Sequence, residues 1–325
     1  MLVVVFAGVF PRFADYGAAW RTIRQMPAAA LAALAIATVI NVAVYPLPFQ
    51  VCLPGIGYWP AFVVRQTSFL ISNSVPGGGA VGLGVQYAML SSYGFGAAAT
   101  TAAIGASTAW NLLVTLSLPL VGVIALLLGA DATATAVAAA AAGLTIVSAA
   151  IAVFTLILRS DATARRVGEV ADRATERFAR RFSRAWEPDL TGQIVAFRAS
   201  IVDLTRRRWH VLTLTSMLQQ LAQFAILQIA VAGLQGPAGG TVTVVEGLAA
   251  FAVARVATFL PVTPGGLGTT DAALAALLIA AGAASSTALA AVLLWRAASF
   301  VPQVVIGTAT FLAWRWRANR TVTTH

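Results

Sequence analysis

The stretch FLPVTPGGLGTTDAAL, residues 259–274, interrupts an apolar region near the end of the chain. It holds two prolines, three glycines, three threonines and one aspartate, Asp271. Proline and glycine both disfavour a continuous helix. The stretch therefore predicts a helix break, with an acidic side chain placed beside it.

The composition around this break is that of a membrane protein. Of the 325 residues, 59% are hydrophobic and 10% are charged, against about a quarter charged in soluble chains. Five apolar blocks are each long enough to cross a hydrocarbon core about 30 Å thick. They are 27–50, 97–128, 133–158, 209–234 and 285–314. The sequence predicts an all-α polytopic membrane protein.

The net charge of +10 is concentrated in one segment. All 21 basic residues are Arg, and twelve of them lie in 159–208 together with seven acidic residues. We interpret this segment as a helical, solvated cytoplasmic loop that sets the topology and touches anionic lipid heads. Specific recognition of a nucleic acid or a protein is the less favoured alternative, so nucleic acid is not an expected partner.

Two segments with the same spacing indicate an internal duplication. Pro76 begins PGGGAVGLGVQYAMLSSYG, and Pro264 begins PGGLGTTDAALAALLIAAG. Each is preceded by an apolar arm with one arginine, Arg65 or Arg255, and is followed by a long apolar helix. A chance pair of Pro-Gly-Gly motifs in a Gly- and Ala-rich chain is the alternative.

The charge map predicts how the two halves are related. With 159–208 inside, hairpins at 58–94 and 241–284 must enter the membrane from opposite faces, as two inverted repeats with re-entrant, broken helices. Arg12, Arg21 and Arg24 then fall outside, in an interfacial helix. The expected domain is a single unit, 1–325. Its parts are a first repeat at 27–128, a linking helix at 133–158, the cytoplasmic segment at 159–208 and a second repeat at 209–316.

Several kinds of chemistry are not expected. A single cysteine, Cys52, and two histidines, His210 and His325, leave no metal site, and no cofactor-binding or nucleotide-binding motif is present. The first ten residues, MLVVVFAGVF, lack the positive charge and the cleavage site of a signal peptide, and we interpret them as a short or truncated first span.

The breaks predict a binding site for an anion. The start of a helix exposes unpaired N–H groups and partial positive charge, which suit a lipid phosphate. Ionisable groups at membrane depth need a cavity or a partner, so two Arg and one Asp around one break could hold a phosphate. The predicted substrate-binding residues are Arg65, Arg255, Pro264, Gly265, Gly266, Gly268, Thr269, Thr270, Asp271 and Arg296. The predicted first-repeat break comprises Pro76, Gly77, Gly78, Gly79 and Gln86.

Structural roles remain open for the same residues. Pro-Gly-Gly could be a tight loop between packed helices, and Asp271 could simply neutralise an arginine. Glu246 could lie near the external surface. Asn73, Gln86 and Asn111 could line a cavity or join helices by hydrogen bonds.

PVTPGGLGTTDAAL and the following LLWRAASFVPQVVIG resemble the lysylphosphatidylglycerol synthase/flippase transmembrane-region family, the membrane part of multiple peptide resistance factor proteins. The family pattern has Glu where this chain has Asp271, and an aromatic-Arg pair that Trp295-Arg296 matches, followed by Pro302 and Gly307. SVPGGGAVG, at 74–82, resembles the first-half motif more weakly, and Gln86 stands near the place of its arginine. The resemblance spans roughly 27–316.

The resemblance implies movement of anionic, aminoacylated or polyprenyl-linked lipids between leaflets of a bacterial inner membrane. It implies no enzymatic activity of this chain, because no aminoacyl-transferase domain is present. Partners implied are membrane lipids, and further partners could be a second copy or a lipid-modifying enzyme. Energy would come from gradients or an accessory protein, unless transport is passive. The alternatives are an enzyme or enzyme subunit acting on a lipid carrier, and a scaffold or small-solute transporter.

Overall fold

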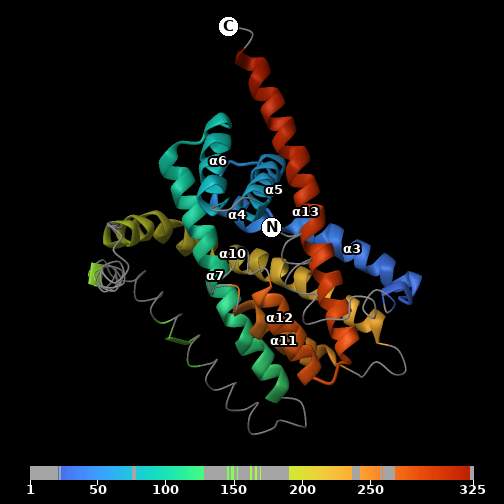
Figure 1. Ribbon diagram of the computed structural model, residues 1–325. Coiled ribbons are helices and arrows are strands. Elements are labelled where there is room, and N and C mark those ends of the chain that lie inside the picture. Colours follow the sequence, from blue (N-terminus) through green and yellow to red (C-terminus); the bar gives the residue numbers. More distant parts are fainter. Residues whose placement is uncertain are drawn as a thin grey trace, which may run out of the picture.

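The computed structural model describes residues 21, 23–74, 78–127, 190–235, 242–256, 258 and 268–322, with single positions between 145 and 169. The described residues are helical and include no strand, so the predicted all-α class is confirmed for this part of the chain (Figure 1). The helices are α3 Ala28–Val44, α4 Leu47–Cys52, α5 Tyr58–Ser74, α6 Gly78–Ser92, α7 Ala97–Leu127, α10 Leu190–Leu234, α11 Val244–Val256, α12 Thr269–Ala280 and α13 Ser285–Val322.

Four stretches of the described helices are long and apolar enough to cross a membrane. They are Ala28–Cys52, Ala97–Leu120, Arg208–Leu234 and Ser285–Arg317, close to four of the predicted blocks. The fifth block, 133–158, falls almost entirely outside the described residues. The chain is therefore a multi-pass membrane protein.

The border predicted between the cytoplasmic segment and the second repeat is not the end of an element. Helix α10 runs without interruption from Leu190 to Leu234 and so continues past Arg208. The predicted border thus lies within one helix, where the polar first part of α10 gives way to its apolar second part.

Two hairpins are built from short helices. Helices α5 and α6 have 17 and 15 residues, and α11 and α12 have 13 and 12. At 1.5 Å per residue these helices are about 18–25 Å long, less than the roughly 30 Å of a hydrocarbon core. Figure 1 shows α5 and α6 on one side of α10, and α11 and α12 on the other.

The two hairpins end in the same way. Helix α6 ends at Ser92 and α12 at Ala280, and two residues later each chain segment has a glycine at positive φ, Gly94 at 86° and Gly282 at 99°. The N–H of the residue after each glycine bonds back to a carbonyl five residues earlier, from Phe95 to Leu90 and from Ala283 to Leu278. This is a Schellman-type helix end, which needs a residue that tolerates the left-handed region. The internal similarity of the sequence is thus matched by identical local structure.

The long helices pack across the two halves. Helix α13, which follows the second hairpin, packs chiefly on α5 of the first. Helix α7, which follows the first hairpin, packs chiefly on α11 of the second, while α3 packs on α10. Each half therefore completes the packing of the other.

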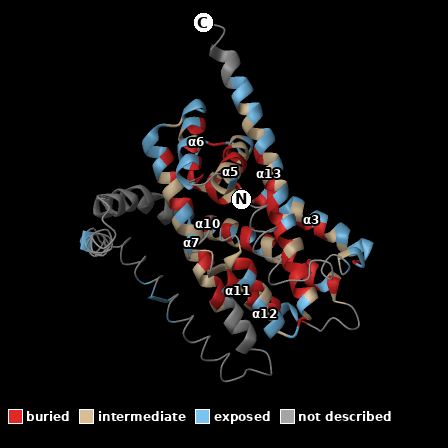
Figure 2. Ribbon diagram, in the orientation of Figure 1, coloured by how far each residue is buried: buried red, intermediate tan, exposed pale blue. Residues whose placement is uncertain are grey.

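Glycines allow the closest of these contacts. A Cβ at Gly307 of α13 would lie 2.5 Å from the carbonyl oxygen of Gln66 on α5. A Cβ at Gly233 of α10 would lie 2.8 Å from the Cβ of Ala30 on α3. Without a hydrophobic driving force in lipid, such close approach is how membrane helices gain contact. Figure 2 shows the buried residues gathered where these helices meet.

The predicted first break is shorter than expected. Gly78 and Gly79 are the first two residues of α6 and are helical, so the prediction of a non-helical segment over 76–79 is wrong at these two positions. A Cβ on Gly78 would lie 2.3 Å from the carbonyl oxygen of Ile71 on α5, so the glycine serves the close packing of α6 on α5. Pro76 and Gly77 lie outside the described residues.

Candidate functional site

Asp271 stands in the first turn of α12 and is completely buried. Its Oδ2 accepts a hydrogen bond of 2.9 Å from the backbone N–H of Gly268, the residue that caps the helix. Gly268 has φ of 88°, a conformation open to glycine at little cost. A carboxylate in this place also compensates the partial positive charge of the helix start.

The other oxygen of Asp271 binds an arginine from the next helix. Arg296 of α13 donates from Nε at 2.8 Å and from Nη2 at 2.5 Å, both to Oδ1. Arg296 is 7% exposed, and its guanidinium lies 4.9 Å from the centre of the Trp295 ring. Two charge-assisted bonds to one oxygen fix the direction of the arginine.

Arg255, near the end of α11, supplies a second positive charge to this region. Its positive charge lies near enough to that of Arg296 for the two to repel each other, and its guanidinium lies 5.9 Å from the ring centre of Phe251. The Phe251 ring in turn meets the Trp295 ring edge-to-face at 6.1 Å. The buried Nε of Arg255 has no hydrogen-bond partner among the described residues.

The charges of this site do not balance. Arg255 and Arg296 carry two positive charges against the single negative charge of Asp271, and the intervening 259–267 contains no ionisable residue. A purely structural ion pair would need one arginine. We refer to Arg255, Asp271 and Arg296 as the second-repeat cluster.

The structure describes only part of the predicted loop. Gly268 is non-helical, as predicted, and Thr269 begins α12. The buried hydroxyl of Thr270 lies 3.3 Å from that of Thr258, which ties the helix start to the chain beyond α11. Pro264, Gly265 and Gly266 lie outside the described residues.

Arg65 is not part of this cluster. It lines a separate cavity of about 240 Å³, which we call the Arg65 cavity, with Tyr45, Pro48, Phe49, Ser107, Thr108, Asn111 and Gln219. Sequence reasoning suggested Asn111 as a polar lining residue but missed Ser107, Thr108 and Gln219. Single polar residues in apolar helices are common, and only the packing of α7 and α10 on each other and on α4, which also contacts α5, brings these together.

Three other polar residues have local structural partners. Gln86 donates from Nε2 to the Ser68 hydroxyl at 2.6 Å and so joins α6 to α5. Asn73 bonds to the carbonyl of Phe69 in its own helix. Glu246 accepts bonds of 2.8 Å from the backbone N–H and the hydroxyl of Thr243, as in a capping box at the start of α11.

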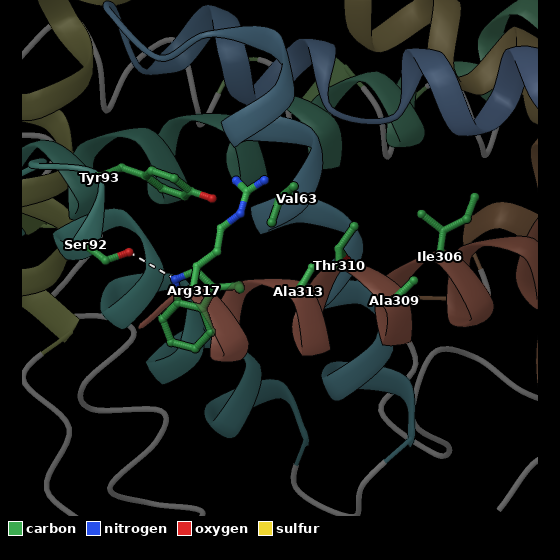
Figure 3. A pocket seen from close by; sticks show the side chains of 9 residues that line it. Val63, Ser92, Tyr93, Ile306, Ala309, Thr310, Ala313 and Arg317 are labelled. Carbon is green, nitrogen blue, oxygen red and sulfur yellow. Dashed lines mark hydrogen bonds between the residues drawn. The ribbon is translucent and has the colours of Figure 1, made fainter. Parts of the chain in front are cut away.

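A larger, mainly apolar cavity of about 530 Å³ lies between α5, the end of α6 and the last turns of α13 (Figure 3). The Trp314 indole donates to the Ser92 hydroxyl at 3.0 Å, and Arg317 is turned towards Tyr93. Burial raises the pKa of Tyr93, and nearby Arg317 opposes this in part, so the phenol is neutral at physiological pH. This cavity is distinct from the second-repeat cluster.

The described part of the molecule is thus a helical, multi-pass membrane protein with a buried arginine–carboxylate pair at a helix start and an additional arginine beside it. Residues 1–307 match the family described as the lysylphosphatidylglycerol synthase TM region, and the chain belongs to that family. No curated protein matches the chain. Membership of this family connects the chain to membrane lipids.

Proposed function

We propose that this protein is a translocase that moves an anionic lipid between the two leaflets of a bacterial inner membrane. The observation that carries the proposal is the unbalanced positive charge of the second-repeat cluster, which is buried among apolar helices. A charge in such a place is expensive unless it has a partner, and Arg255 has no carboxylate of its own among the described residues. The phosphate of a lipid would supply the missing negative charge.

In this proposal each residue has a definite role. Asp271 holds Arg296 by two bonds and is itself held by Gly268, so the arginine is fixed before a ligand arrives. Arg255 and Arg296 bind the phosphate oxygens, and the start of α12 adds N–H groups. The aminoacyl or polyprenyl part of a lipid would lie outside this cluster.

Alternating access would come from the relation between the two hairpins. Their short helices, matched ends and positions on opposite sides of α10 support re-entrant hairpins in inverted repeats. Because α7 and α13 each pack on the opposite hairpin, movement of one half would be transmitted to the other. We infer that lipid reaches the cluster from one leaflet and leaves towards the other.

We further infer that the protein is not itself an enzyme. Asp271 is the best placed candidate for a nucleophile or base, but both of its oxygens already accept hydrogen bonds from Gly268 and Arg296. The carboxylate is thus committed to holding the start of α12 and the side chain of Arg296.

Proteoliposomes that contain the purified protein and fluorescent lipids test the proposal. The panel compares phosphatidylglycerol, aminoacylated phosphatidylglycerol and a polyprenyl phosphate with zwitterionic phosphatidylcholine, and a membrane-impermeant quencher reports the outer leaflet. We expect at least one anionic or aminoacylated lipid to exchange faster than phosphatidylcholine. Rates equal to those of protein-free liposomes for every lipid would refute the proposal.

A further inference from the structure

We propose that the Arg65 cavity is a second binding site for a phosphate group, separate from the second-repeat cluster. Arg65 comes from α5 and Tyr45 from the turn between α3 and α4, and the other lining residues come from α4, α7 and α10. The inference rests on the proposed lipid function for the source of the phosphate, and on the cavity itself for the site.

The cavity contains a positive charge without a negative one. No Asp or Glu is among its lining residues. The buried Nε of Arg65 has no hydrogen-bond partner among the described residues, and its Nη2 donates only a weak bond of 3.3 Å to the Tyr45 hydroxyl. The guanidinium lies 5.1 Å from the Tyr45 ring centre and 5.6 Å from that of Phe49, so aromatic faces partly compensate its positive charge.

Two polar groups around Arg65, those of Tyr45 and Asn111, have hydrogen-bond donors left for a ligand. The Tyr45 hydroxyl accepts from Arg65, which leaves its own proton for a ligand. The side-chain Oδ1 of Asn111 accepts from Gln220 Nε2 at 3.4 Å, which leaves the N–H groups of the Asn111 side-chain amide as donors. A ligand in contact with an arginine, a phenol and an amide donor must present acceptor oxygens, and phosphate does.

The size of the cavity limits the ligand to a head group. About 240 Å³ is less than the roughly 300–1,000 Å³ of pockets that enclose whole small molecules. The cavity therefore takes the phosphate and its nearest atoms, and acyl chains remain outside it.

The internal repeat gives an independent reason to relate this cavity to the second-repeat cluster. Thr108 lies as far from the start of α7 as Arg296 lies from the start of α13. Both residues line a polar site, with an arginine contributed by the first helix of a hairpin, Arg65 in one half and Arg255 in the other. The two sites thus draw on corresponding helices of the two halves, although Arg65 lies 11 residues before Pro76 and Arg255 lies 9 residues before Pro264.

The test counts bound lipids by native mass spectrometry of the full chain in detergent, with phosphatidylglycerol as the probe and phosphatidylcholine as the reference. We expect Arg65→Gln to weaken the binding of one of two phosphatidylglycerol molecules about tenfold or more, since hydrogen bonds to charged groups are of that strength, while the molecule at the second-repeat cluster stays bound. Arg315→Gln removes an exposed arginine of α13 and is the matched control. Equal binding by Arg65→Gln and the control would overturn the proposal.

Two further variants separate binding from folding. Arg65→Lys keeps the charge and should retain part of the affinity, and Thr108→Val keeps the shape of the lining and should weaken binding less than Arg65→Gln. If Arg65→Gln does not fold, these two variants decide, and unchanged binding in both overturns the site. Competition by inorganic phosphate would identify a free anion as an occupant, and its failure would identify the lipid head group. In either case the binding should be lost or weakened in Arg65→Gln.

This experiment does not depend on transport. A protein that binds phosphatidylglycerol through Arg65 but moves no lipid would contradict the proposed function and leave the site in place. Conversely, transport with no change in binding on loss of Arg65 would contradict only the second site.

Discussion

At the scale of the residue, Asp271 has two structural roles. Its Oδ2 caps α12 through Gly268, and its Oδ1 fixes Arg296. Removing one member of a buried ion pair leaves the other charge uncompensated. The stability lost in this way is larger than the net stability that the pair contributes. Asp271 is therefore the residue at which folding and the proposed activity are most closely coupled.

We expect Asp271→Asn to lower the free energy of unfolding by about 3–5 kcal/mol, because Arg296 loses its counter-ion in a buried place. Asp271→Glu should retain most of the stability, since a glutamate can also cap a helix from this position. Thermal unfolding of both variants in the same detergent measures the difference. Equal melting temperatures for Asp271→Asn and the wild type would show that the pair is not important for the fold.

The sequence predicted that Asp271 would lie near Arg255 and Arg296, but not which of the two arginines it would bind. Asp271, Arg255 and Arg296 were expected around one break because they lie on three consecutive elements. Which arginine Asp271 would hold was not predictable, because the choice depends on the rotation of α11 and α13 about their axes. Arg65 was grouped with them by charge alone, and packing places it in another cavity.

At the scale of the element, the contact between α13 and α5 depends on one small residue. Gly307 lies against the backbone of Gln66, one turn beyond Gln303, which is itself buried. The motif that includes Gly307 was recognisable in the sequence. The reason for the glycine was not, because nothing in a single sequence indicates which helix lies opposite.

We expect Gly307→Ala to destabilise the protein by about 1–3 kcal/mol, because the added methyl group must push α13 away from α5. Gly84→Ala is the matched control, since Gly84 is also helical but nothing lies within 4 Å of a Cβ built there. The control should be neutral or slightly stabilising. Similar melting temperatures for the two variants would show that α13 and α5 are not held this closely.

At the scale of the whole molecule, the two halves complete each other's packing. The sequence indicated the repeat through paired Pro-Gly-Gly segments, and matching glycine turns at Gly94 and Gly282 agree with it. The helix starts were less predictable than the helix ends. Helix α6 begins at Gly78, which packs closely on α5, and a single sequence does not show that contact. The opposite orientation of the halves in the membrane stays a prediction.

Labelling of single cysteines tests that orientation. Ser91→Cys and Ser285→Cys place thiols at exposed serines near the outer ends of the two hairpins, in a Cys52→Ala background. Inverted repeats require an impermeant maleimide to reach them from opposite sides of the membrane. Ser68→Cys, at a buried serine, is the control that should react only after denaturation. Reaction of both exposed sites from the same side would rule out the inverted arrangement.

The most direct test of the central claim is the rate at which phosphatidylglycerol changes leaflet in proteoliposomes that contain equal amounts of folded wild-type, Arg296→Gln or Arg315→Gln protein. Arg296 binds the phosphate in our account, whereas Arg315 is exposed and lies outside the site. We predict a rate at least about tenfold lower for Arg296→Gln, from the loss of a charged hydrogen bond, and a wild-type rate for Arg315→Gln. A wild-type rate for folded Arg296→Gln would contradict the account.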